Sequence, residues 1–172
     1  MTYKEYQTSS KRTCTKLEND KLDLCHMILG IHSESNEVFT AIRNLDNVNI
    51  GEELSDGIFY LSNYCTFRRY DLEEIFTKPV VNMFNEEYNS SQLADIVKKY
   101  IAYGKEINKV EEFNILRKLA FNYLDAFSTH NLDIFKCLHN NIKKLKIRFP
   151  EKFSTDLALN RNLKAERIEL EK

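Results

Sequence analysis

The sequence predicts an all-α protein. Its 172 residues include only four glycines and two prolines, the residue types that most often interrupt helices. Long stretches repeat apolar residues with the period of about 3.6 that an amphipathic helix requires. The sequence has no glycine-rich phosphate loop and no strand-rich region, which excludes P-loop and Rossmann nucleotide-binding domains. We therefore expect a helix bundle.

The periodic stretches predict seven helices and a further short helix near the C-terminus. Asn131 is expected to cap the helix that follows it, because an asparagine side chain accepts hydrogen bonds from free backbone amides. Phe149 and Pro150 end that helix. Pro79 and residues 85–91 mark the main internal break. The predicted helices span residues 3–18, 20–45, 50–69, 71–77, 91–108, 111–129 and 131–148.

Length and composition fit one soluble domain, with 42% hydrophobic and 30% charged residues. A net charge of −1 argues against nonspecific nucleic-acid binding. We find no signal peptide and no apolar run of membrane length, so we expect a cytoplasmic protein without a nucleic-acid or membrane partner. The four cysteines lack CxxC or Cys/His spacing, which argues against disulfides and a zinc site.

Two acidic pairs suggest a metal site. Glu34 and Glu37 are three residues apart, as are Glu53 and Asp56, so each pair lies on one face of its helix. Both pairs flank a buried stripe and share their side with a glycine. Four carboxylates converging there would repel one another unless a cation lay between them. Mg²⁺ suits such ligands, with Mn²⁺ as an alternative. Spacing alone leaves open that the pairs are solvated rims of amphipathic helices.

The C-terminal third carries a cluster of positive charge. Such a cluster is either a solvated helix face or a phosphate-binding site, and the pattern does not decide between them. The residues concerned are Lys143, Lys144, Lys146, Arg148 and Lys152.

Four segments carry a resemblance to a known family. Residues 30–38 and 52–61, which hold the two acidic pairs, resemble the ExxE and ExxD helices of the MazG-like all-α nucleoside triphosphate pyrophosphohydrolases. Residues 5–13 are similar to the opening of phage-type members. Residues 141–153 and 158–167 resemble the C-terminal signature of that group. The segments occur in the family's order and cover parts of the first 76 and last 42 residues.

The resemblance implies Mg²⁺-dependent hydrolysis of a nucleoside triphosphate. An activated water would attack the α-phosphorus and release a nucleoside monophosphate and pyrophosphate. Glu34, Glu37, Glu53 and Asp56 would be the metal ligands and catalytic residues. Phage-type relatives imply deoxynucleotide substrates and control of nucleotide pools, in the host cytoplasm if the protein is phage-encoded. Motif position assigns Lys144, Arg148 and Arg161 to the phosphates, Gln7 and Asn160 to the sugar or base, and Tyr60 to stacking on the base.

The middle of the chain departs from the family, since about fifty residues separate segments that adjoin in phage-type members. They are either a plain helical insertion or a decayed second copy of the helix pair. Residues 57–61 can be aligned with residues 120–124, and Leu116 and Leu119 then stand where Glu53 and Asp56 do in the first copy. Because relatives build their site from helices of two subunits, we expect a homo-oligomer or a single-chain pseudo-dimer.

The sequence thus predicts one all-α domain over residues 1–172, and the resemblance implies a helix bundle of the all-α NTP pyrophosphatase type with extra central helices. Residues 1–76 would supply the metal-site helices, 77–130 the insertion or degenerate repeat, and 131–172 the substrate-binding helix and tail. Two other functional classes stay open. One is a catalytically weak nucleotide-binding or regulatory helical module. The other is a helical interaction protein in which the acidic pairs are coincidental.

Overall fold

The structure is a computed structural model that describes residues 1–78 and 89–172. These residues form nine α-helices and, within the same ranges, no strand, which confirms the all-α class. Each predicted helix has a counterpart. In chain order the helices are α1 (Tyr3–Lys11), α2 (Asp20–Arg43), α3 (Asn47–Arg68), α4 (Leu72–Thr77), α5 (Asn89–Tyr103), α6 (Lys109–Thr129), α7 (Ile134–Arg148), α8 (Thr155–Leu159) and α9 (Leu163–Leu170).

The first helix is shorter than predicted. Thr2 caps α1 by accepting a hydrogen bond from the amide of Glu5, whose carboxylate accepts one from the amide of Thr2. The prediction that this helix continues to residue 18 is wrong, because α1 ends at Lys11. Just beyond it, the guanidinium of Arg12 donates to the backbone carbonyls of residues 149–151. These bonds attach the end of α1 to the end of α7.

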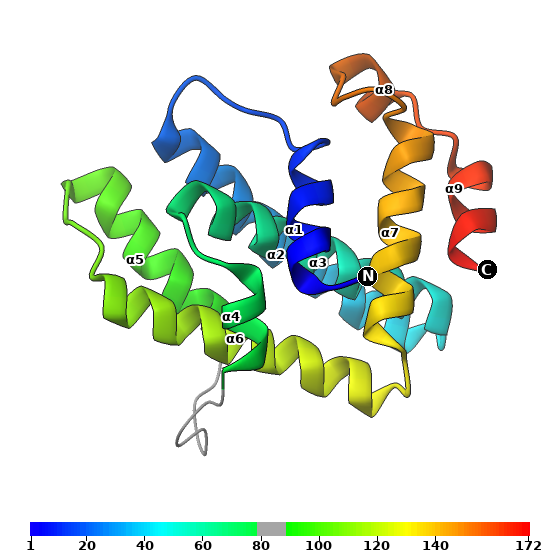
Figure 1. The fold of residues 1–172 in the computed structure, drawn as a ribbon, viewed down its shortest axis with the longest axis horizontal. Coiled ribbons are helices and arrows are strands. Elements are labelled where there is room, and N and C mark those ends of the chain that lie inside the picture. Colours follow the sequence, from blue (N-terminus) through cyan, green and yellow to red (C-terminus); the bar gives the residue numbers. More distant parts are fainter. Residues whose placement is uncertain (79–88) are drawn as a thin grey trace.

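The long helices α2 and α3 form a hairpin at the centre of the molecule (Figure 1). Asn19 caps α2, and Asp46 caps α3 after a turn in which Leu45 adopts a positive φ of 55°. The two helices approach closely at Gly30, where a Cβ atom would lie 2.3 Å from the ring of Tyr60. This close approach is why α2 needs a glycine at that position.

A second hairpin, formed by α5 and α6, packs against the first through contacts of α5 with α2 and of α6 with α3 (Figure 1). Glu112 in α6 is fully buried and accepts hydrogen bonds from Arg68, Tyr64 and Tyr70. Burial alone would raise the pKa of Glu112. The hydrogen bonds outweigh it, with Arg68 contributing most, and hold that pKa below its ordinary value. This ion pair fastens the second hairpin to the first.

Two predicted boundaries in the second half of the chain are wrong. The helix expected to reach residue 108 ends at Tyr103, because Gly104 follows with a positive φ of 65°. Asn131 is not the N-cap of α7. It follows α6 with a positive φ of 53°, a conformation that asparagine tolerates better than most residues. Asp133 caps α7 instead, by accepting hydrogen bonds from two amides of its first turn.

The predicted central break falls largely outside the described residues. Pro79 and residues 85–88 are not among them, and residues 89–91 belong to the start of α5. The two central helices pair with each other and with the first hairpin, an arrangement compatible with either an insertion or a repeat. The pseudo-dimer therefore stays a prediction.

The other side of the α2–α3 hairpin is covered by α1 and α7, which both pack on α3 (Figure 1). Tyr6 of α1 is fully buried, and its hydroxyl group donates to the carbonyl of Ser55 in α3 or to the side-chain oxygen of Asn141 in α7. α9 packs on α7. In the part of the chain that the structure describes, no helix combines the length and apolar character needed to cross a membrane.

Candidate metal centre

Three of the four predicted metal ligands lie together. Glu34 and Glu37 project from α2, and Glu53 projects from α3. One carboxylate oxygen of each lies within 4.8 Å of the others. We call these three side chains the carboxylate cluster. A divalent cation can take one oxygen from each of them after small side-chain adjustments.

The carboxylate cluster is partly buried, and its charges repel one another. Glu53 is 8% exposed, Glu34 is half-buried and Glu37 is exposed. Burial, followed by the charge of Asp56, raises the pKa of Glu34. The same two causes, in the same order, raise the pKa of Glu53. The cluster therefore holds either protons or a cation more readily than three unpaired negative charges.

Asp56, the fourth predicted ligand, is engaged by α7. Its Oδ1 accepts a hydrogen bond of 2.5 Å from the side-chain amide of Asn141, and its Oδ2 lies 2.5 Å from Nζ of Lys144. Lys144 also donates to Glu52, over 3.1 Å. Both oxygens of Asp56 thus bind α7 to α3. The role of Asp56 as a metal ligand stays a prediction.

Lys144 is an interior residue of the site and not a surface cation. Its side chain is fully buried between Asp56 and Glu52. Burial opposes the charge of Lys144, but the two carboxylates outweigh this effect and raise the pKa of the ammonium group. The basic cluster is therefore divided, since Lys146 and Lys152 are exposed to solvent. The ammonium group of Lys144 is bound to two carboxylates, and its role as a phosphate contact stays a prediction.

The two predicted phosphate-binding arginines converge on one carboxylate. Glu166 in α9 is 2% exposed, and it accepts hydrogen bonds of 3.0 and 2.5 Å from Arg148. It also accepts bonds of 3.3 and 2.8 Å from Arg161. Arg161 lines a hollow of about 270 Å³ together with Glu52 and Glu53. We call it the C-terminal hollow. It places Arg161 beside the carboxylate cluster, and Glu166, to which the sequence gave no role, holds both guanidinium groups.

Gln7 lies away from the carboxylate cluster. Its amide donates to Thr66 and to the carbonyl of Tyr70, and its oxygen accepts from the amide of Leu72. Thr66 and Glu53 stand at opposite ends of α3, about 20 Å apart along the helix axis. Gln7 therefore fixes the turn between α3 and α4 against α1 and is not part of the candidate site.

Two further predicted substrate contacts have structural partners of their own. Asn160 is exposed at the end of α8 and donates a bond of 2.9 Å within its own helix. The ring of Tyr60 packs over Gly30 and meets the ring of His26 edge-on, with centroids 5.7 Å apart. Burial, and then the charge of Glu34, raise the pKa of Tyr60 to about 12. Tyr60 is therefore close to the cluster but packed between helices.

A cavity of about 480 Å³ adjoins the carboxylate cluster. We call it the interhelical cavity, because residues of α2, α3, α5 and α6 line it. Glu34 and Glu53 form part of its wall, and much of the remainder is apolar. Tyr123 also lines the cavity, and its hydroxyl group, which lies against Gly57 of α3, is buried and has no hydrogen-bond partner among the described residues. The sequence held one signal for this tyrosine, since it aligns with Tyr60 in the repeat register.

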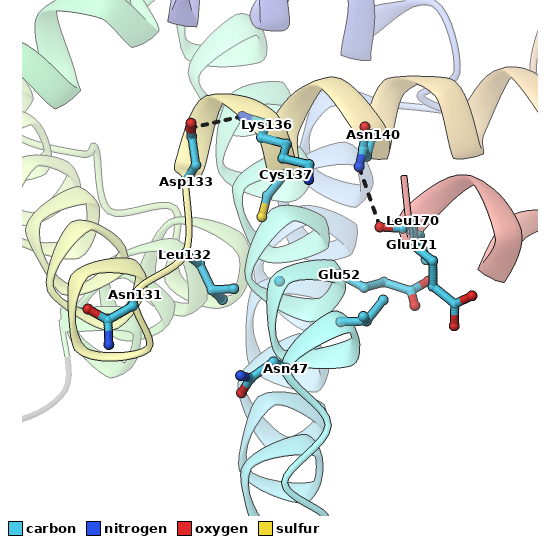
Figure 2. A pocket seen from close by; sticks show the side chains of 12 residues that line it. Asn47, Glu52, Asn131, Leu132, Asp133, Lys136, Cys137, Asn140, Leu170 and Glu171 are labelled. Atoms are coloured by element: carbon cyan, nitrogen blue, oxygen red, sulfur yellow. Dashed lines mark hydrogen bonds between the residues drawn. The ribbon is translucent and has the colours of Figure 1, made fainter.

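A second cavity, of about 350 Å³, lies between the first turns of α3, the α6–α7 connection and the end of α9 (Figure 2). Cys137 points toward Gly51, where a Cβ atom would lie 3.0 Å from its sulfur. Asn140 donates to the carbonyl of Leu170 over 3.4 Å. Among the described residues, none that carries an unpartnered buried polar atom lines this cavity. We assign it no ligand.

Comparison of the chain with protein-family models, curated proteins and solved structures finds no match in any of the three.

Proposed function

We propose that the protein hydrolyses nucleoside or deoxynucleoside triphosphates to a nucleoside monophosphate and pyrophosphate with Mg²⁺, as a step in nucleotide-pool control. The observation that carries the proposal is the convergence of Glu34, Glu37 and Glu53 from two helices. Mg²⁺ prefers oxygen ligands and commonly bridges to substrate phosphates. The resemblance of residues 30–38 and 52–61 to the ExxE and ExxD helices supports the same activity.

The spaces around the carboxylate cluster fit an elongated anionic ligand. Glu53 lines both the interhelical cavity and the C-terminal hollow, so the cluster borders both spaces. The cavity has largely apolar walls, and the hollow is lined by Arg161 and Arg167 together with the carboxylates of Glu52, Glu53 and Glu166. A nucleoside triphosphate has matching parts, an organic body at one end and a chain of negatively charged phosphates at the other.

The chain's own residues can position and stabilise such a substrate. Bound Mg²⁺ would offset the charge of the triphosphate and activate a water molecule. The guanidinium groups of Arg148 and Arg161, which Glu166 holds side by side, would bind phosphate oxygens with the N–H groups that Glu166 does not use. Lys144 offsets the charge of Asp56 next to the cluster. A cluster carboxylate oxygen that the ion does not use can orient the attacking water or accept its proton.

Pyrophosphate release from canonical and modified dNTPs tests this activity. We expect Mg²⁺-dependent release by the wild type and a loss of about 100-fold or more in kcat/KM for Glu53→Gln and for Glu37→Gln, because each removes one ligand charge. Glu111→Gln is the matched control, since this glutamate is exposed at the start of α6. If the cluster variants turn over as fast as the wild type, the site assignment is wrong.

The engagement of Asp56 favours a second candidate function. Its bonds to Asn141 and Lys144 leave three carboxylates close together, enough for one ion but a weaker basis for a two-ion site. A one-ion site suits a module that binds a nucleotide and turns it over slowly or not at all. Calorimetry that detects Mg²⁺-dependent nucleotide binding, combined with a failure to release pyrophosphate, would select this alternative.

A further inference from the structure

The last helix buries charged residues and exposes apolar ones. The buried residues of α9 are Glu166 and Glu169, whereas Leu163 and Ile168 are 62% and 52% exposed. The preceding helix α8, which the structure describes in full, buries no residue. Burial of apolar surface is the main term that stabilises a packed helix. α9 gains little from it, in contrast to α7, on which it packs (Figure 1).

Ion pairs attach α9 to the rest of the molecule. Two of the three have a partly exposed cation, and such pairs stabilise a fold only weakly because water and salt screen the charges. The third is largely buried and loses much of its attraction to the cost of removing two charges from water. The carbonyl of Leu170 also accepts a hydrogen bond of 3.4 Å from Asn140. The three pairs are Lys143–Glu169, Asp46–Arg167 and Arg148–Glu166, at 3.4, 3.1 and 2.5 Å.

α9 and the residues just before it form one wall of the C-terminal hollow. The other wall belongs to α3, which contributes Asn49, Glu52 and Glu53. Each residue that lines the hollow comes either from these three or from residues 161–167. A movement of α9 away from α3 would therefore open the hollow and expose the carboxylate cluster at Glu53.

The two arginines beside the hollow lie on different sides of this movement. Arg148 belongs to α7, whereas Arg161 precedes α9 and is 37% exposed at its side chain. Glu166 accepts hydrogen bonds from both. An anion that contacts both guanidinium groups would add a further link between α7 and the segment that carries α9.

We propose that residues 161–172 form a lid over the C-terminal hollow, which ion pairs hold closed. The lid opens while the rest of the fold stays intact, and it closes on the phosphate chain of a ligand at the carboxylate cluster. The opening follows from the contacts of α9 alone, because segments with little apolar burial open at low free-energy cost. The closure rests on the proposed function, because it takes phosphates to lie between Arg148 and Arg161.

Hydrogen exchange of the full chain, followed by mass spectrometry, measures the opening. After correction for intrinsic rates, we expect the amides of α9 to exchange about 100-fold or more faster than those of α7. Low concentrations of urea should speed exchange in α7 but not in α9, because local opening exposes little surface. Raising NaCl from about 0.05 to 0.5 M should speed exchange in α9 about threefold, because salt screens its ion pairs.

Two variants test whether the ion pairs hold the lid. Arg167→Gln removes the pair with Asp46 and should speed exchange in α9 about 2- to 5-fold. Lys98→Gln is the matched control, because it removes an exposed ion pair with Asp95 inside α5. It should leave exchange in α9 unchanged. An equal response of α9 to both substitutions would contradict the role of the Asp46–Arg167 pair.

Inorganic tripolyphosphate with Mg²⁺ tests the closure. At about 10 to 100 times its dissociation constant, this probe should slow exchange in α9 about tenfold or more, and Mg²⁺ alone should not. Arg161→Gln should remove most of this protection, since it removes the contact that the lid makes with phosphate. Lys164→Gln, on an exposed cation of the same helix, should retain it. Glu53→Gln should abolish the protection and leave the opening without ligand unchanged.

The possible failures can be told apart. Exchange in α9 that matches α7 in rate and in urea dependence would overturn the lid, because α9 would then open only when the whole protein unfolds. If tripolyphosphate binds with Mg²⁺ but leaves exchange in α9 unchanged, the closure is overturned and the metal site stands. Absence of any Mg²⁺-dependent binding of tripolyphosphate would overturn the proposed function and the closure together.

Discussion

The ammonium group of Lys144 lies 2.5 Å from Oδ2 of Asp56, with none of the lysine side chain exposed to solvent. It also lies 3.1 Å from a carboxylate oxygen of Glu52, so removing this cation leaves two acidic groups without their positive partner. We expect Lys144→Met to lower the free energy of unfolding by about 3 kcal/mol, because it breaks a buried ion pair from one side. Urea denaturation of the two proteins measures the difference.

Lys146→Met is the matched control for this substitution. Lys146 lies on the same helix but is exposed, so its replacement should change the free energy of unfolding by less than about 0.5 kcal/mol. Equal effects of the two substitutions would mean that Lys144 does not carry the ion pair in solution.

The carboxylate cluster could be predicted because its determinants are local. The spacing of Glu34 and Glu37 fixes them on one face of α2, and the short turn after Arg43 brings α3 back along the same helix. Glu53 then faces the first pair. Two consecutive helices and one turn determine this arrangement. The helices can be recognised from their apolar periodicity, and the turn from the break between them.

The position of Asp56 could not be predicted because it depends on a distant helix. Its partners, Asn141 and Lys144, come from α7, about ninety positions later, and only the packing of α7 on α3 brings them to it. From the sequence, a lysine in a basic stretch is also expected to lie on the surface. The spacing of Asn141, Lys144 and Arg148 at intervals of three and four held a weak signal, since it puts all three on one side of α7.

Glu166 holds Arg148 and Arg161 side by side, so its neutralisation should disturb both arginines. We expect Glu166→Gln to lower kcat/KM of the proposed reaction about tenfold, equivalent to about 1.4 kcal/mol, mainly through KM, since the guanidinium groups lose their common anchor. Steady-state pyrophosphate release measures both constants. Glu151→Gln, on an exposed residue just after α7, should leave them unchanged. A fall in kcat alone would contradict a positioning role.

The Glu112 ion pair predicts a loss of stability in acid. The pKa of Glu112 lies below its ordinary value in the folded protein, so the unfolded chain binds the proton more readily. Its stabilising contribution is therefore present above the ordinary carboxyl pKa of about 4.3 and is lost as the pH falls through the lower folded value. Glu112→Gln should cost about 3 kcal/mol at neutral pH. Denaturation curves at several pH values should show this cost shrinking in acid, and a cost independent of pH would contradict the prediction.

The contact between Gly30 and Tyr60 predicts that the effect of Gly30→Ala on the free energy of unfolding changes sign when Tyr60 is replaced by alanine. In the wild type, Gly30→Ala should lower the free energy of unfolding by about 1–3 kcal/mol, because the new Cβ would lie 2.3 Å from the tyrosine ring. In the Tyr60→Ala background the ring is gone, and Gly30→Ala should instead stabilise the protein by about 0.5–1 kcal/mol through helix propensity. Thermal and urea denaturation measure all four proteins. Destabilisation of equal size in both backgrounds would place the strain elsewhere.

The raised pKa values of Glu34 and Glu53 predict that Mg²⁺ stabilises the protein more strongly at higher pH. Because burial and neighbouring charges raise these values, the folded protein without metal retains protons that the unfolded chain has lost. The stability of the metal-free protein should therefore fall as the pH rises from the ordinary carboxyl range through the raised values. A cation requires the ionised carboxylates, so it should restore more stability at about pH 8 than at about pH 6.

Thermal denaturation with Mg²⁺ and with EDTA at both pH values measures this linkage. The double variant Glu34→Gln with Glu53→Gln should remove both the pH dependence and the response to Mg²⁺, because it keeps the size of the side chains and removes their titration. Glu111→Gln, on an exposed residue of α6, should retain both. A Mg²⁺ effect that is the same at the two pH values would mean that the ion does not compete with protons at the carboxylate cluster. It would then have to bind elsewhere, and the proposed hydrolysis would lose its metal site.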